Sequence, residues 1–224
     1  MVPTIQHRLL SGLALLVLAC SPSDRPSPGA AADRTKPGGG PVLTGAGATF
    51  PNPIYTKWFD AYYKQTGARI NYQSIGSGGG IRQFIEGTVD FGATDAPMTD
   101  EQVAAVKGNV LHVPTVLGAV VATYNIAAAG KSALRFDGPT LADIYLGLIT
   151  KWSDPRIAAI NPGVRLPDQD ITVVHRSDGS GTSFIFTDYL SKVSPAWKGR
   201  VGKGTSVGWP IGVNTKMELW AKYP

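Results

Sequence analysis

The 224-residue sequence contains a single cysteine, Cys20, and only three histidines, which lie far apart at His7, His112 and His175. One cysteine excludes an internal disulfide framework. Because no cysteine cluster accompanies the histidines, a structural zinc site is not expected. The sequence therefore predicts a protein that works without a metal or another cofactor.

The sequence also lacks any dense block of lysine and arginine, and its formal net charge of +5 is spread along the chain. A nucleic-acid partner is therefore not expected, although a mild positive field favours any anion. The Gly-x-x-x-x-Gly-Lys-Ser/Thr phosphate loop is missing, which argues against an NTPase.

An apolar run from Leu9 to Ala19 is too short to span a bilayer comfortably and ends at Cys20. We interpret residues 1–20 as a signal peptide whose Val-Leu-Ala-Cys ending resembles a bacterial lipobox, in which the cysteine is lipidated. The alternative is a buried free cysteine behind an ordinary signal. Residues 21–41 are rich in Pro, Ser and Gly and are expected to form a disordered tether, so the membrane contact would be a lipid anchor only.

From residue 42 onward, short apolar or β-branched runs alternate with segments of helical periodicity, which predicts an α/β fold. The expected strands lie at 43–50 (entering a loop), 70–74, 89–93, 110–113, 118–124 and 171–174, and the expected helices at 53–66, 81–85, 99–107, 141–148 and 184–190. In the first helix, Asn52 is expected to be the N-cap. The core face of this helix is expected to consist of Trp58, Phe59, Tyr62 and Tyr63.

The stretch from Arg176 to Thr182 stands between a β-branched run and an apolar-periodic run, as expected of a strand, a glycine turn and a helix. Such a turn places Ser180 and Thr182 at the positive end of a helix, where free backbone N–H groups suit a small anion. Arg176 adds a guanidinium, with Asp178 there to orient it. The alternative is an ordinary turn in which Ser180 or Thr182 serves only as a cap.

Three other strand ends share this character, namely Ala48-Thr49-Phe50, Gly76-Ser77-Gly78 and Asp95. In open α/β sheets, ligands collect at the carboxyl ends of the strands. Several glycine- and hydroxyl-rich loops that converge there would form a nest of backbone donors.

These motifs together resemble the phosphate-binding proteins of bacterial phosphate ABC transporters, within the type II periplasmic-binding-protein superfamily. The resemblance covers roughly residues 43–212 and rests on Thr44–Pro51, Gly76-Ser77, Asp90–Pro97 and Arg176–Ser183, with further similarity at Ile144–Gly147, Lys151-Trp152 and Trp209–Gly212. It implies a two-lobed α/β fold with a ligand cleft between lobe 1 (42–115) and lobe 2 (116–224), hinged near Pro114–Gly118.

The resemblance further implies a site for one inorganic phosphate, mono- or dihydrogen, without any catalytic residue. The residues carried over as ligands are Thr49, Phe50 (through its backbone N–H), Ser77, Asp95, Arg176, Ser180, Gly181 and Thr182, with Asp178 holding Arg176. The implied partner is the membrane permease of a phosphate ABC importer, and the implied location is the periplasm or a membrane-anchored lipoprotein of the cell envelope.

Asp95 bears on which anion is accepted. A carboxylate that faces an anion in a dry cleft repels it unless the anion brings a proton to donate. Hydrogen phosphates carry such a proton at neutral pH and sulfate does not, so Asp95 is expected to select phosphate. The alternative is an exposed turn residue before Pro97.

Residues 213–224 do not follow the family pattern, and family members continue well beyond this point. A shifted reading frame or a truncated gene product would explain the difference and leaves open a non-functional fragment with an incomplete second part.

A third hypothesis is a serine-dependent hydrolase or phosphatase that uses Ser180 or Ser77. Ser180, however, lacks the Gly-x-Ser-x-Gly elbow, and His175 is expected to be packed or exposed rather than catalytic.

Overall fold

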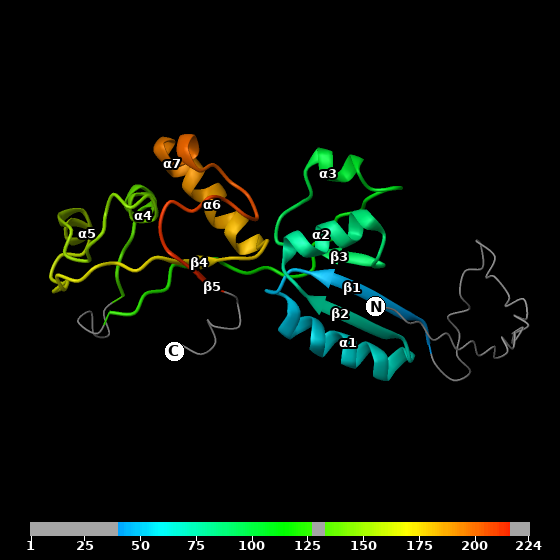
Figure 1. Ribbon diagram of the computed structural model, residues 1–224. Helices are drawn as coiled ribbons and strands as arrows, with labels where there is room; N and C mark the ends of the chain where they lie inside the picture. The colour runs from blue at the N-terminus through cyan, green and yellow to red at the C-terminus, as the bar shows by residue number, and fades with distance from the viewer. Residues whose placement is uncertain (1–39, 127–132, 216–224) are drawn as a thin grey trace, which may run out of the picture. The chain divides into compact units, whose positions relative to one another are not determined.

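The computed structural model describes residues 40–126 and 133–215, so the expected signal peptide, Cys20 and most of the expected tether lie outside the described residues. Strands and helices alternate, which confirms the α/β class (Figure 1). The elements are β1 (Val42–Gly47), α1 (Asn52–Thr66), β2 (Arg69–Ser74), α2 (Ser77–Glu86), β3 (Phe91–Ala93), α3 (Asp100–Ala104), α4 (Gly138–Tyr145), α5 (Pro155–Ile160), β4 (Val174–Arg176), α6 (Gly181–Val193), α7 (Pro195–Arg200) and β5 (Val213–Thr215).

The first sheet has the strand order β2-β1-β3, and both pairings are parallel. Its carboxyl ends therefore meet at one edge, where Gly47, Ser74 and Ala93 end their strands. The loops that follow these three strands carry three of the four polar motifs singled out in the sequence. Parallel pairing thus brings together residues that are far apart in the chain.

The two faces of this sheet carry different helices. Phe91 on β3 faces α1, because its ring lies 6.4 Å from that of Phe59, whereas a side chain at the neighbouring Gly92 would contact Phe84 of α2. Helices α1 and α2 accordingly lie on opposite faces of the sheet (Figure 1). The sheet with its two helices forms an α/β layer, and the polar loops follow the carboxyl ends of its strands.

The aromatic face of α1 is only partly a core face. Tyr55 is buried and Phe59 half-buried, but Trp58, Tyr62 and Tyr63 are each more than 40% exposed. The expectation that all four aromatic residues pack inward was wrong for these three. One helix over a three-stranded sheet turns a narrow stripe inward, and Tyr55 with Phe59 occupies it.

The second part of the described chain is built on a two-stranded parallel sheet, β4 with β5, and on helices α4 to α7. Two apolar clusters support it. One consists of Ala142, Leu146, Leu190 and Trp197, the other of Ile144, Ile149, Ile157 and Val173. Trp209 packs against the first cluster and Trp152 against the second, which fixes the segments on either side of β4.

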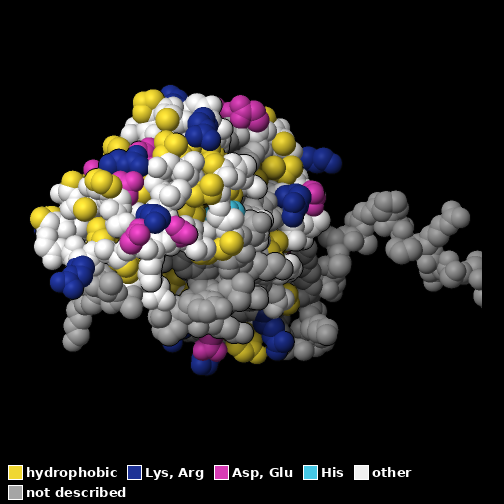
Figure 2. Space-filling model, turned by 60° about the vertical axis from the view of Figure 1, so that its left-hand side comes forward, with side chains coloured by type: hydrophobic (Ala, Val, Ile, Leu, Met, Phe, Trp, Pro, Cys, Tyr) yellow, Lys and Arg dark blue, Asp and Glu magenta, His cyan; other side chains and the backbone are white. Residues whose placement is uncertain are grey.

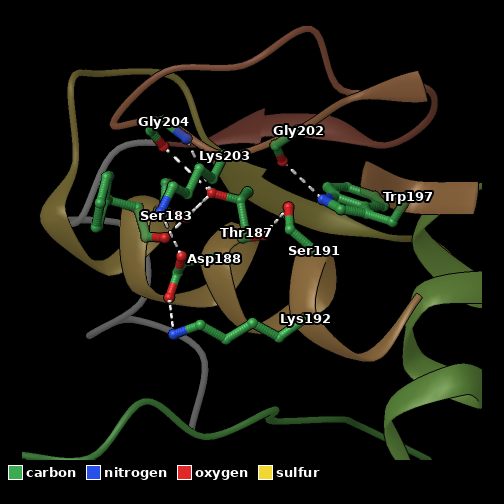
Figure 3. A network of polar contacts seen from close by, with 10 residues as sticks. Ser183, Thr187, Asp188, Ser191, Lys192, Trp197, Gly202, Lys203 and Gly204 are labelled. Carbon is green, nitrogen blue, oxygen red and sulfur yellow. Dashed lines mark hydrogen bonds and ion pairs between the residues drawn. The ribbon is translucent and has the colours of Figure 1, made fainter. Parts of the chain in front are cut away.

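The segment after α7 is held to α6 by a polar network (Figure 3). Thr187 is fully buried, and its hydroxyl accepts a hydrogen bond from Gly204 N at 3.2 Å while it donates to Ser183 O at 2.7 Å. Lys203 pairs with Asp188 at 2.8 Å. The same segment then offers Thr205 O to the N–H of Ser180 at 2.9 Å. The network therefore positions the residue that begins α6.

Several local expectations were wrong. The carbonyl of Pro51 accepts from Tyr55 N, so α1 begins at Asn52, which does not cap it. Helix α2 begins at Ser77, through glycines that were expected to form a loop, because close packing against the sheet offsets the weak helix propensity of glycine.

Residues 110–113 and 118–124, expected as strands, are irregular. A strand needs a hydrogen-bonded neighbour, and no strand among residues 40–126 and 133–215 pairs with either segment. Their apolar side chains are exposed instead, with Leu111 84% and Val121 71% accessible. The apolar runs therefore did not indicate strands, because periodicity alone does not show whether a neighbouring strand is available.

Positive and negative side chains are mixed on the protein surface that Figure 2 shows. On the face shown in Figure 2, Lys and Arg side chains are scattered and several stand next to Asp or Glu. Ion pairs among the described residues include Lys151 with Asp168 and Lys192 with Asp188. Across the part of the chain that the structure describes, no helix has the length and apolar character needed to cross a bilayer.

Thr187→Val should lower the free energy of unfolding by about 1–3 kcal/mol. The substitution removes the buried hydroxyl that accepts the hydrogen bond of Gly204 N, while valine keeps the shape of the threonine side chain. Urea denaturation followed by circular dichroism measures the change. Thr172→Val, at an exposed position, serves as the control and should be near neutral. A stability of Thr187→Val equal to that of the control would contradict the role given to this network.

Candidate anion-binding site

Backbone contacts tie the first three polar loops together. The carbonyl of Gly47 accepts hydrogen bonds from Ile75 N at 3.1 Å and Gly76 N at 2.9 Å, and Ala48 N donates to Ala93 O at 2.8 Å. A side chain at Gly47 would stand 2.0 Å from Ala93 O, at a φ of 145° that L-residues rarely adopt. Glycine at this position is therefore what allows the three loops to meet.

Ser77, Asp95 and Gly181 meet at one point. A Cβ atom added to Gly181 would lie 2.3 Å from Ser77 Oγ and 2.4 Å from Asp95 Oδ2, so the backbone of Gly181 lies directly against both side chains. Gly78 N also donates to Gly179 O at 2.9 Å. The structure thus brings the second loop, the loop after β3 and the stretch from Arg176 to Thr182 together.

Two serine hydroxyls in this region have their acceptor side occupied. Ser77 Oγ accepts from Asp95 N at 3.2 Å, and Ser180 Oγ accepts from Ser183 N at 3.3 Å as the N-cap of α6. Both side chains are almost completely buried. A hydroxyl that already accepts a backbone N–H has its own proton to donate, so both serines are suited to donate hydrogen bonds.

The beginnings of α2 and α6 lie at the same place, because Ser77 opens α2 and Gly181 opens α6. The first N–H groups of a helix have no partner within it, and the helix dipole makes this end positive. Two such ends next to donating hydroxyls create a local environment that favours negative charge.

Arg176 is held by Asp178 in a two-pronged pair. Arg176 Nε donates to Asp178 Oδ1 at 2.6 Å, and Arg176 Nη2 donates to Asp178 Oδ2. The arginine is buried, whereas the Asp178 side chain is 30% exposed. The pair fixes the plane of a buried guanidinium next to the turn that begins α6, as the sequence predicted for Asp178.

Asp95 is the one acidic side chain among these donors that lacks a complete set of partners. Its Oδ1 atom is buried and has no hydrogen-bond partner among the residues that the structure describes. Burial raises the pKa of the Asp95 carboxyl above its usual range, and the nearby positive charge of Arg176 only partly opposes this effect. An unpaired buried acceptor is costly, so this oxygen is the natural partner of an incoming donor.

The remaining predicted residues occupy the expected loops. Thr49 and Phe50 directly follow Ala48, with Thr49 partly buried and the Phe50 ring against the backbone of Gly118. Thr182 is the second residue of α6 and is partly buried. The contacts of these three residues neither establish nor exclude their predicted role as ligands, which stays a prediction.

Sequence reasoning missed two residues that hold the backbone of the site loops, Tyr72 and Thr205. Tyr72 on β2 holds Ala48 O, and Thr205 O holds Ser180 N. No sequence motif marks either residue, because a tyrosine in a strand and a carbonyl in a loop give the same sequence pattern whether or not they support a site. The alternation of Tyr72 with its polar neighbours indicated only which face it occupies.

His175 and His112 are occupied by other contacts. His175 stacks on Trp209 with a centroid distance of 4.6 Å, and its Nδ1 lies 3.2 Å from Arg176 O. His112 Nε2 accepts from Met98 N at 3.1 Å. Of the two arrangements expected for His175, packed or exposed, the structure shows the packed one. In residues 40–126 and 133–215, no group of three or more His, Cys, Asp or Glu side chains is placed to hold a metal ion.

Parallel strands with polar loops at their shared carboxyl edge define an α/β protein of the ligand-binding type. The chain belongs to the PBP superfamily, whose domain model matches residues 26–217. A solved structure of a Clostridium perfringens protein, assigned as a phosphate ABC transporter substrate-binding protein with bound phosphate, shares the fold at a TM-score of 0.50 and 22% identity, over 66% of this chain and 56% of that one. The expected binding-protein fold is thereby confirmed.

Curated relatives extend this family assignment. The chain is 54% identical over 175 residues to a phosphate-binding protein PstS of Pasteurella multocida, matching 78% of this chain and 50% of the relative. It is 46% identical over 211 residues to a phosphate-binding protein PstS of Xylella fastidiosa, matching 91% of this chain and 57% of the relative. The chain therefore spans about half the length of the curated relatives it matches.

Asp95→Asn should stabilise the ligand-free protein at pH 7.5. The folded-state pKa of Asp95 lies above its unfolded value, so folding at neutral pH is opposed by the burial of a charged carboxylate, and this penalty disappears as the pH falls through the raised pKa. The gain in urea midpoint over wild type should therefore shrink between pH 7.5 and pH 4. Asp170→Asn, at an exposed carboxylate, is the control. A gain for Asp95→Asn that is equal at both pH values would rule out this electrostatic origin.

Proposed function

We propose that this chain is a solute-binding protein that captures inorganic phosphate, as the mono- or dihydrogen anion, for an ABC importer. The observation that carries the proposal is the buried Asp95 Oδ1, which lacks a hydrogen-bond partner among the described residues and stands among donors. A ligand that satisfies both features must carry several acceptor oxygens and at least one proton that it can donate in a hydrogen bond. Hydrogen phosphates are anions of this kind at neutral pH, whereas sulfate is not.

The proposed roles follow from the chemistry of each group. Ser77 and Ser180 donate through their hydroxyls, whose lone pairs already accept backbone N–H groups. Gly181 and Thr182 donate from the N-terminus of α6, and Thr49 and Phe50 donate from the first loop. Arg176 supplies positive charge in an orientation fixed by Asp178. Asp95 accepts a hydrogen bond from the O–H group of the ligand and thereby excludes fully ionised anions such as sulfate.

The names of the relatives support the transport context. Proteins called phosphate-binding protein PstS match most of this chain, and the Clostridium perfringens structure is assigned to a phosphate ABC transporter. We infer delivery to a membrane permease, a location in the periplasm or on the membrane surface, a signal peptide over residues 1–20 and lipidation at Cys20. Lobe 1 would comprise residues 42–115 and lobe 2 residues 116–224, with a tether at 21–41.

The enzyme alternative receives less support. A serine hydrolase needs a base close to its nucleophile. The contacts of Ser180 with Ser183 N and of His175 with Trp209 assign a capping role to the first and a packing role to the second. A family fragment that keeps these residues without binding anything is the remaining alternative, and phosphate binding by the chain itself distinguishes it.

Asp95→Asn should reduce the preference for phosphate over sulfate by about a hundredfold or more, because the amide NH₂ can donate to sulfate where the carboxylate repels it. Equilibrium dialysis of the wild type, Asp95→Asn and the exposed-site control Asp170→Asn against both anions measures this ratio. A preference that Asp95→Asn leaves intact would remove Asp95 from the selectivity mechanism.

Arg176→Ala should weaken phosphate binding by about 1.5–3 kcal/mol, or roughly tenfold to more than a hundredfold in Kd, through the loss of charge-assisted hydrogen bonds. Arg165→Ala removes an exposed arginine and should leave the affinity within about twofold, as expected of a distant surface charge. Calorimetric titration measures both variants. Equal affinities would place Arg176 outside the site.

A further inference from the structure

The Tyr72 hydroxyl reaches from β2 to the first polar loop. It donates a hydrogen bond to Ala48 O at 2.6 Å. The ring beneath it is held by an edge contact with Tyr55 at 5.3 Å and by stacking on Phe91 at 6.2 Å and 14°. Because aromatic contacts on two sides fix the ring, the hydroxyl has a fixed position from which to hold the loop.

The bond to Ala48 O has a consequence for the next residue. The carbonyl of Ala48 and the N–H of Thr49 belong to one planar peptide unit, so fixing one fixes the direction of the other. The unit before it is already anchored, since Ala48 N donates to Ala93 O at 2.8 Å. Tyr72 therefore governs the first peptide unit of the loop that is not held by the sheet, the unit that leads into Thr49 and Phe50.

We propose that Tyr72 is a positioning residue for the anion site, which holds Ala48 O so that the donors of Thr49 and Phe50 are already oriented before the ligand arrives. The inference rests on the proposed function, because only that function assigns Thr49 and Phe50 to a ligand. Preorientation matters for affinity because a loop that must be ordered upon binding loses part of the binding free energy.

The environment of Tyr72 keeps it a donor. Burial, assisted by Tyr55 and by the negative charge of Asp95, raises the pKa of the Tyr72 phenol well above its usual range. The hydroxyl thus stays protonated at every pH at which the fold is used. The same low-dielectric surroundings strengthen its bond to Ala48 O.

The test is Tyr72→Phe, which keeps the ring and removes only the hydroxyl. The Kd for phosphate should rise about five- to tenfold, as expected for one buried hydrogen bond. The ratio of phosphate to sulfate affinity should not change, because Asp95 is untouched. A merely structural role would lower thermal stability without this selective loss of affinity.

Tyr55→Phe is the matched control. Its hydroxyl lies in the same aromatic cluster and bonds Thr115 Oγ1 at 2.8 Å, on a segment other than the first loop. The two variants should lose similar thermal stability, but Tyr55→Phe should keep the phosphate Kd within about twofold. An equal loss of affinity in both variants would show general softening of the cluster and would overturn the inference.

A measurement without ligand separates this inference from the proposed function. In the ligand-free protein, the amide resonance of Thr49 should shift in Tyr72→Phe and stay in place in Tyr55→Phe. An unshifted Thr49 amide together with wild-type phosphate affinity would overturn the positioning role. Failure of the wild type to bind phosphate would count against the proposed function, and the Thr49 amide would still decide whether Tyr72 orients the loop.

Discussion

Close backbone approach at a few glycines is the constraint on which the candidate site depends. The carbonyl of Gly47 accepts hydrogen bonds from the N–H groups of Ile75 and Gly76. Gly181 lies where any side chain would collide with Ser77 and Asp95. These contacts bring loops from different strands within hydrogen-bonding distance of one another. The polar groups of the candidate site are therefore placed by backbone contacts that a side chain at these glycines would prevent.

The electrostatics of the site follow from this arrangement. Two helix N-termini and two oriented hydroxyls create an excess of donors, and the charge of Arg176 is balanced by Asp178. The carboxylate of Asp95 is destabilised in this environment, since burial raises its pKa and leaves Oδ1 without a partner among the described residues. Under the proposed function, an anion that also donates one hydrogen bond would supply the partner that Asp95 Oδ1 lacks among the described residues.

The sequence was sufficient to predict the meeting of the polar loops, because parallel strands place successive carboxyl ends at one edge. It also predicted the pairing of Asp178 with Arg176, which is a local pattern with a local physical cause. The start of α2 at Ser77 was missed, since glycines disfavour helices until packing against a sheet compensates.

Other parts of the fold and site depend on contacts that have no sequence pattern. The bond from Tyr72 to Ala48 O and the bond from Ser180 N to Thr205 O each join residues that are far apart in the chain. Likewise, the apolar run around Leu111 predicted a strand, and this was wrong because strand formation depends on a neighbour that periodicity cannot reveal.

Calorimetric titration of the purified 224-residue chain with phosphate at neutral pH, with sulfate titrated in parallel, tests the central claim most directly. The account predicts saturable one-to-one binding of phosphate and no saturable heat with sulfate, because only the hydrogen phosphates can donate to Asp95. Binding of sulfate as tight as that of phosphate would contradict the role of the unpartnered carboxylate. A folded sample that binds neither anion would contradict the proposed function itself.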